Sequence, residues 1–382
     1  MKKLILLAAL LLTLSGCSGG LGMTSNFSET ERLKLIRTVA VDKTALGVTV
    51  TAATASGIGD EGEAIFAAEG ATLAEAVGAL EKNSMKYDAN FTHTDFIVVG
   101  ESAAADGIAE LLDYVARAMQ MRLGTKLFVA SGSAQELVTS ASGGNTSASD
   151  MLASLVKDVP FASGAAVTSC GDAVRSLAED GCALVRMVKS EKSGEVSPDG
   201  EYTAIVPDGF AVIGDGKLVS HLPQEDDAAI GLLTGTMKSG YDTVSVDGAR
   251  MTLQLDSYRV TALPAFGDDG LAFHIRAELN ENVVETSLPA DAELSAVQAA
   301  AERELSEKMR TQIEKAIRDS QKTGDYLHLW RMLERKAPLK TAKLTDRAGA
   351  YRNAPFTVEV TARIGRTGDL SSPLGTGGGD AP

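Results

Sequence analysis

The sequence is short of cysteine, of tryptophan and of positive charge. Its 382 residues include 3 cysteines and 1 tryptophan, and 36 Lys and Arg stand against 51 Asp and Glu, a formal net charge of -15. Three cysteines are too few for a disulfide framework. The charge balance excludes a typical nucleic-acid-binding protein, which needs a basic face to neutralise phosphates. The negative net charge also argues against binding of the chain to an anionic bilayer through its overall charge.

The sequence also lacks a long hydrophobic segment. Residues 4–14 form an apolar run of eleven residues behind Met1-Lys2-Lys3, too short to span a bilayer core of about 30 Å. A basic start before such a run is typical of a signal peptide. The run ends in Leu14-Ser15-Gly16-Cys17, the pattern of a bacterial lipobox. We therefore predict a signal peptide over 1–16 and a diacylglycerol on the Cys17 sulfur; the alternative is an ordinary secretory signal with an incidental cysteine.

Lipidation at Cys17 would decide how the mature chain meets the membrane. Two acyl chains hold a protein on a bilayer stably, whereas one holds it marginally. Residues 17–30 are mostly small and polar, and they predict a flexible tether. No later window reaches 18 apolar residues, so we expect the mature chain to be anchored to the membrane without crossing it.

The first half of the mature chain predicts a mixture of strands and helices. Hydrophobic residues make up 44% and charged residues 23%, as in ordinary globular proteins. Short apolar or alternating runs predict strands and 3.6-residue periods predict helices. The strands are expected at 35–42, 47–54, 63–69, 96–100, 126–130 and 183–188, and the helices from Thr72, over 108–119 and over 173–179. Residues 140–150 predict a loop or a break.

The second half predicts two further units. The polar segment 189–200 predicts a linker, followed by short strands within 202–219 and longer ones over 250–262 and 271–285. Leu294 opens an apolar stripe that predicts a helix of about 27 residues, and 356–362 predicts a closing strand. The irregular order favours an α+β fold, with three mixed domains in a row behind the lipidated tether. We place these domains at 31–195, 201–248 and 249–367, before a disordered tail over 368–382.

No residue pattern predicts catalysis or a cofactor. The four histidines are isolated, without the paired spacing of a zinc site, and no Gly-x-Ser-x-Gly elbow occurs. Residues 57–62 have the glycine spacing of a dinucleotide-binding motif. That motif requires a helix directly after its third glycine, and none is expected after residue 62, so we predict no dinucleotide site here. Cys170 and Cys182 could form a disulfide outside the cytoplasm or could simply pack in the core. We expect no enzyme, no cofactor and no metal site.

The order of the motifs resembles the Ger(x)C family, the lipoprotein C subunits of spore germinant receptors. After the lipobox, six segments match the family pattern in order: residues 39–43 (VAVDK), 70–76 (GATLAEA), 93–101 (HTDFIVVGE), 107–117 (GIAELLDYVAR), 122–137 (RLGTKLFVASGSAQEL) and 208–219 (DGFAVIGDGKLV). The long helix and the strand that ends in residues 364–368 also resemble the family's C-terminal domain.

The resemblance implies a non-catalytic, three-domain α+β lipoprotein on the outer face of the bacterial cell or spore inner membrane. It implies assembly with two polytopic subunits, A and B, that sense small germinants, and a role in nutrient-triggered germination. No ligand-binding residue follows from it. The alternative is a solute-binding lipoprotein of a transporter, although the aromatic content of 5% and the lack of a regular βαβ order speak against that class. A hydrolase is disfavoured because no nucleophile–base pair is evident.

Overall fold

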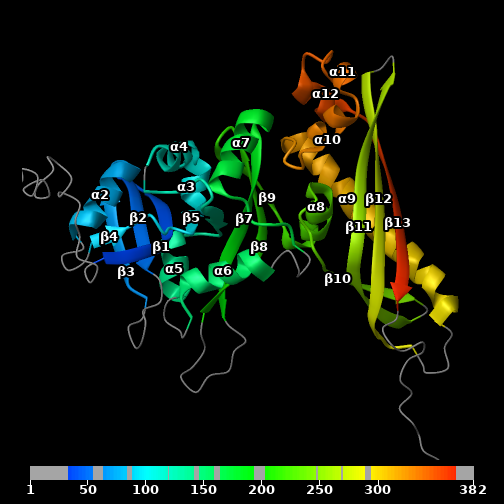
Figure 1. Ribbon diagram of the computed structural model, residues 1–382, viewed down its shortest axis with the longest axis horizontal. Helices are drawn as coiled ribbons and strands as arrows, with labels where there is room; N and C mark the ends of the chain where they lie inside the picture. The colour runs from blue at the N-terminus through cyan, green and yellow to red at the C-terminus, as the bar shows by residue number, and fades with distance from the viewer. Residues whose placement is uncertain are drawn as a thin grey trace, which may run out of the picture.

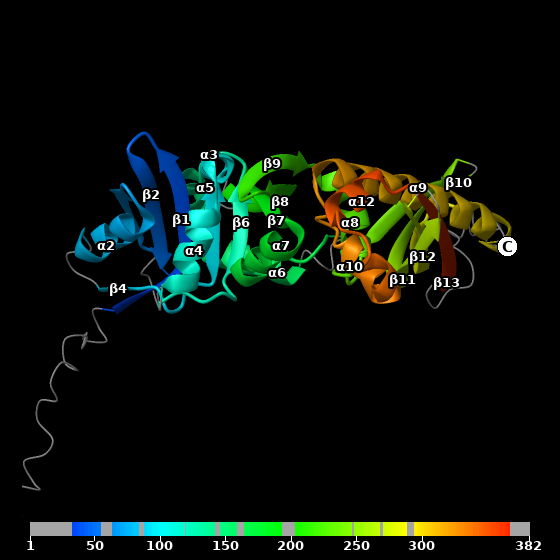
Figure 2. The ribbon, with the colours of Figure 1, turned by 90° about the horizontal axis from the view of Figure 1, so that it is seen from above.

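The chain folds around two β-sheets that stand side by side along the long axis of the molecule (Figure 1, Figure 2). The computed structural model describes residues 33–54, 63–83, 88–118, 120–141, 146–158, 164–192, 203–246, 248–267, 270–288 and 294–366. We refer to residues 33–222 as the N-terminal module and to residues 227–366 as the C-terminal module.

The sheet of the N-terminal module has a parallel centre and antiparallel edges. Along the sheet the strands are β3 (Ile65–Gly70), β2 (Gly47–Thr54), β1 (Leu33–Thr44), β5 (Phe96–Gly100), β6 (Lys126–Ala130), β7 (Cys182–Lys192), β8 (Thr203–Gly214) and β9 (Lys217–Leu222), and the short β4 (Asp88–Asn90) pairs with β1. The pairs from β1 to β7 are parallel and the outer ones antiparallel.

Helices cover both faces of this sheet. One face carries α2 (Leu73–Asn83), α3 (Glu101–Asp106), α4 (Ala109–Arg117) and α7 (Cys170–Asp180), and the other carries α5 (Ala134–Ala141) and α6 (Ala148–Asp158) (Figure 1). Strand β5 is buried along its whole length. Its Ile97 and Val99 pack on the first face and Phe96 and Val98 on the second, which explains why this strand is a continuous apolar run.

The C-terminal module is a long hairpin with a helix laid across it. Its elements are α8 (Asp227–Thr234), β10 (Tyr241–Val246), β11 (Ala249–Gly267), β12 (Gly270–Thr286), α9 (Leu294–Thr323), α10 (Leu329–Lys336), α11 (Pro338–Thr341), α12 (Arg347–Asn353) and β13 (Phe356–Arg366). Strand β13 runs parallel to β12 at one edge and β10 antiparallel to β11 at the other. The predicted apolar stripe of α9 is confirmed, because Leu305, Met309 and Ile313 are buried against the sheet.

Polar side chains of α9 hold both edges of the C-terminal sheet. At the β13 edge, Ile364 N donates to Glu302 Oε1 at 2.9 Å. At the β10 edge, Ser245 N donates to Glu304 Oε1 at 3.1 Å, and Lys308 Nζ lies 2.7 Å from an oxygen of Asp242. Backbone N–H groups that an open edge would offer to other chains are thereby used internally.

The α+β class agrees with the structure, but the segment after β7 differs from expectation. Residues 189–192, predicted as linker, extend β7 and pair with 203–206 of β8; residues 193–202 lie outside the described part. The interval predicted as a middle domain, 201–248, supplies β8 and β9 to the first sheet and β10 to the second. Its hydrogen bonds are therefore shared between two modules.

A buried carboxyl group lies in β12. Glu281 is only 1% exposed, and its Oε2 atom has no hydrogen-bond partner within the described residues. Burial raises the pKa of Glu281 to about 8; repulsion from Asp242 adds to this effect, and Lys308 opposes it. The folded chain therefore favours the protonated form of Glu281.

We predict that Glu281→Gln makes the free energy of unfolding less dependent on pH. Because the folded-state pKa is raised, the stabilising protonated form is fully present below the ordinary value of 4.5 and is lost as the pH rises through about 8. Across that window the wild type should lose up to about 5 kcal/mol relative to the variant, measured by urea denaturation. The exposed Glu278 on the same strand supplies the control Glu278→Gln; an unchanged pH profile for Glu281→Gln would contradict the assignment.

Candidate functional site

The two modules share one hydrophobic cluster, which forms the junction between them. The N-terminal module contributes six residues to this cluster: Ala165, Cys182, Leu184, Phe210, Val212 and Leu222. The other members come from the C-terminal module, from α8, the β11–β12 hairpin, α9, α10, the turn before α10 and the segment around α12. Charged and polar side chains are built into this otherwise apolar contact. We call it the junction and define its polar members as Asp180, Arg186, Asp227, Asp325, His328 and Arg331.

A buried ion pair crosses the junction. Arg186 of β7 is 0% exposed, and its Nη1 donates to Asp227 Oδ2 at 2.6 Å. The guanidinium also donates to the Ala165 carbonyl at 2.8 Å and lies 3.7 Å from the centre of the Phe210 ring. Burial raises the pKa of Asp227 and lowers that of Arg186, but a guanidinium stays protonated in proteins.

The ion pair connects the central sheet of one module to the first residue of a helix in the other. Asp227 begins α8, and α8 packs on α9 and β11. Removing one partner of a buried pair leaves a charge without compensation, which typically costs about 3–5 kcal/mol. The relative position of the modules therefore depends on this contact.

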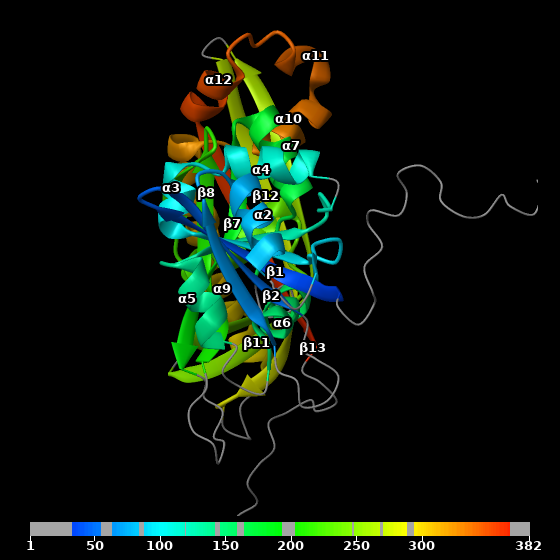
Figure 3. The same ribbon diagram turned by 90° about the vertical axis from the view of Figure 1, so that its left-hand side faces the viewer.

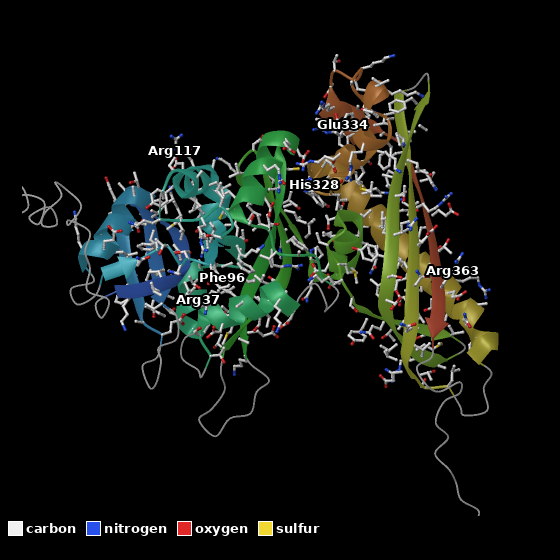
Figure 4. All side chains as sticks on the ribbon, in the orientation of Figure 1. Arg37, Phe96, Arg117, His328, Glu334 and Arg363 are labelled. Carbon is white, nitrogen blue, oxygen red and sulfur yellow. The ribbon has the colours of Figure 1, made fainter. Side chains whose placement is uncertain are left out.

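A second polar contact closes the junction at the end of α7. Asp180 Oδ2 accepts from Arg331 Nη2 at 2.6 Å and lies 2.8 Å from His328 Nδ1. Burial opposes ionisation of Asp180, but hydrogen bonds from His328 and Arg331 outweigh it and hold its pKa below the ordinary value. Figure 4 shows His328 between the two modules. Glu179 adds an ion pair to Arg331 at 2.8 Å.

Asp325 shapes the turn that presents His328. Its two carboxylate oxygens accept the backbone N–H groups of Leu329 and Trp330 at 2.9 and 2.6 Å, at the start of α10. Burial raises the pKa of Asp325 to about 7, although those two N–H groups favour the charged form. His328 itself has a φ of 57°, a left-handed conformation that is uncommon outside glycine.

Gly324 explains how the turn before α10 approaches the N-terminal module so closely. Its φ is 141°, and a Cβ atom there would lie 3.1 Å from the Cys182 sulfur. A larger residue would crowd the Cys182 side chain, which would have to shift by a few tenths of an ångström, and it would also strain the backbone at this φ. A cavity of about 140 Å³ lies beside this turn, lined by Asp180, Asp325, Trp330 and seven other residues. The Trp330 indole nitrogen is buried without a hydrogen-bond partner among the described residues.

The residues singled out from the sequence are not brought together. Cys17 lies outside the described residues. Cys170 and Cys182 are free, buried thiols, which differs from the disulfide considered above. The cause is visible in the packing, because Cys170 belongs to the cluster under α7 and Cys182 to the junction cluster. Burial raises the pKa of each to about 12, so neither is a reactive thiolate.

The histidines do not gather into a site. His221 hydrogen-bonds to the Asp208 carbonyl, and His274 to the side chains of Thr357 and Glu359. His328 hydrogen-bonds to Asp180 in the junction. Among the residues that the structure describes, no three His, Cys, Asp or Glu side chains form a group that could hold a metal. In the same part of the chain, no helix is both long and apolar enough to span a bilayer.

These features define a two-module α+β protein whose buried polar groups hold the modules together. Two family models match it: "Spore germination protein N-terminal domain" over residues 26–190 and "Spore germination B3/GerAC like, C-terminal" over residues 208–368. The chain therefore belongs to the GerAC-like family of spore germination proteins. The resemblance to the Ger(x)C family is confirmed.

A solved structure supports the fold. The crystal structure of the GerBC protein is 17% identical in sequence, covers 85% of this chain and 96% of its own, and gives a TM-score of 0.55. No curated protein sequence matches the chain significantly.

We predict that Asp227→Ala destabilises the whole molecule. The change leaves the Arg186 charge buried without its partner, and the free energy of unfolding in urea should fall by about 3–5 kcal/mol. The exposed neighbour Glu225 supplies the control Glu225→Ala, which should stay within about 0.5 kcal/mol.

A double variant separates loss of the pair from loss of packing. Arg186→Leu combined with Asp227→Leu removes both charges, and apolar replacement of a buried pair is often nearly neutral. The double variant should therefore be more stable than Asp227→Ala. An Asp227→Ala protein as stable as the wild type would show that the pair does not hold the junction.

Proposed function

We propose that this chain is the C subunit of a spore germinant receptor, a non-catalytic lipoprotein that acts in nutrient-triggered germination. The match of family models to both modules is the observation that carries the proposal. In this role the chain assembles with two multi-span subunits, A and B, in which the small germinant is sensed.

The junction supports a structural role for this subunit. Arg186, Asp227 and Asp180 all form ion pairs between the modules. Their charges therefore stabilise the position of one module relative to the other. A body held in this way can transmit or resist a displacement of its membrane partners as one piece, because neither module turns freely on the other.

Attachment to the membrane is proposed to occur through Cys17. The apolar run before it and the Leu-Ser-Gly-Cys motif support lipidation of this cysteine after export. From Cys17 to the first described residue, Leu33, the chain can span at most about 55 Å when fully extended. The folded body can therefore reach subunits in the outer surface of the membrane while it stays anchored.

We predict that Cys17→Ala releases the protein from the spore inner membrane and slows germination in response to nutrients. Loss of both acyl chains should lower the membrane-bound fraction at least about tenfold after a high-salt wash, which removes electrostatically bound protein. Fractionation with immunoblotting and germination kinetics measure the two effects.

Ser18→Ala is the matched control, because it changes the neighbouring residue and leaves the cysteine. It should behave as the wild type. Full membrane retention of the Cys17→Ala protein together with normal germination would refute the anchoring role.

A further inference from the structure

The helices α10, α11 and α12 form a small basic lobe, defined here as residues 329–353. This segment contains seven Lys and Arg residues and two acidic residues, in a chain with a net charge of -15. Figure 1 and Figure 3 show α11 and α12 at the upper end of the molecule, beside the end of the β11–β12 hairpin. The lobe therefore has the opposite sign of charge to the chain as a whole.

The positive charges of the basic lobe lie on its surface. Six of them are exposed: Arg335, Lys336, Lys340, Lys343, Arg347 and Arg352. Each acidic residue of the lobe is engaged locally, since Asp346 accepts the Gly349 N–H at 2.8 Å and Glu334 lies 3.4 Å from Arg347. Figure 4 labels Glu334 within this lobe. The surface that the lobe presents to a partner is therefore strongly basic.

A protruding leucine stands among these charges. Leu339 is 83% exposed and follows Pro338 at the start of α11. Lys336 and Lys340 flank it along the chain. An exposed apolar side chain between lysines suits the boundary of a bilayer, where the apolar group enters the acyl region and lysines reach up to the headgroups.

The basic lobe is held rigidly on the C-terminal module. Leu329 and Leu333 are fully buried in the junction cluster. The Tyr351 ring stacks on Phe273 with 6.1 Å between centroids, and Lys340 Nζ lies 5.3 Å from the centre of the Phe266 ring. A preformed surface loses little conformational freedom on binding.

We propose that the basic lobe docks on anionic phospholipid headgroups, as a second membrane contact besides the N-terminal anchor. Charge complementarity favours an anionic partner, and a leucine in α11 that is 83% exposed favours a bilayer over a peptide, which would need a groove. The acidic remainder of the chain does not prevent this, because repulsion is screened within about 8 Å at physiological salt. The negative net charge of the whole sequence gives no indication of this local basic surface.

The test is sedimentation of the full mature chain with vesicles, using a Cys17→Ser protein so that no lipid anchor contributes. Vesicles of phosphatidylcholine with about 30% phosphatidylglycerol should bind the protein at about 0.1 M salt, and pure phosphatidylcholine vesicles should not. The triple change Lys336→Glu, Lys340→Glu and Lys343→Glu should lower binding at least about tenfold. Leu339→Ser should weaken it about threefold or more.

Matched controls carry the same changes elsewhere on the surface. Lys82→Glu, Lys157→Glu and Lys217→Glu reverse three exposed lysines of the N-terminal module, and Leu46→Ser alters a leucine that is 85% exposed. Both control proteins should bind vesicles as the wild type does, and circular dichroism should confirm folding in all variants.

Three outcomes would overturn the proposal: no binding of the anchor-free chain to anionic vesicles, an equal loss in the control triple variant, or unchanged vesicle binding by the lobe variant. In the third case, loss of co-purifying membrane proteins from the lobe variant would assign the basic lobe to a protein partner instead.

Discussion

The buried ion pair between Arg186 and Asp227 is the constraint on which the arrangement of the two modules depends. Arg186 lies on the sheet of the N-terminal module and Asp227 is the first residue of α8. Burying either charge without the other would cost several kcal/mol, so the two modules have to pack together for the pair to form. The contact of Asp180 with His328 and Arg331 fixes the same junction at a second point. Together with the shared apolar cluster, these two polar contacts hold the modules in one arrangement.

The same long helix that packs on this junction also completes the C-terminal sheet. The end of α9 contributes Ile313 and Ile317 to the shared cluster, while its earlier turns supply Glu302 and Glu304 to the two sheet edges. A displacement of either module would therefore act on α9. The membrane contact that we propose for the basic lobe is thereby connected to the N-terminal module through the packing and hydrogen bonds of α9.

Local patterns in the sequence predict much of the fold. The apolar run of β5 and the apolar stripe of α9 predict these elements, because the spacing of apolar residues within one segment shows which of its faces is buried. The helix α6 was missed, although Ser147 Oγ accepts the Asp150 N–H at 3.0 Å as a helix cap. The junction could not be predicted, because Asp180 and His328 are 148 positions apart and a single sequence does not show which distant charges meet.

The most direct test of the account is affinity purification of a C-terminally tagged copy from detergent-solubilised spore membranes, with partners identified by mass spectrometry. We expect two multi-span membrane proteins to co-purify in comparable amounts, and an untagged strain to yield neither. Recovery of the chain alone, or together with an ATP-driven permease as for a solute-binding lipoprotein, would contradict its role as a germinant receptor subunit.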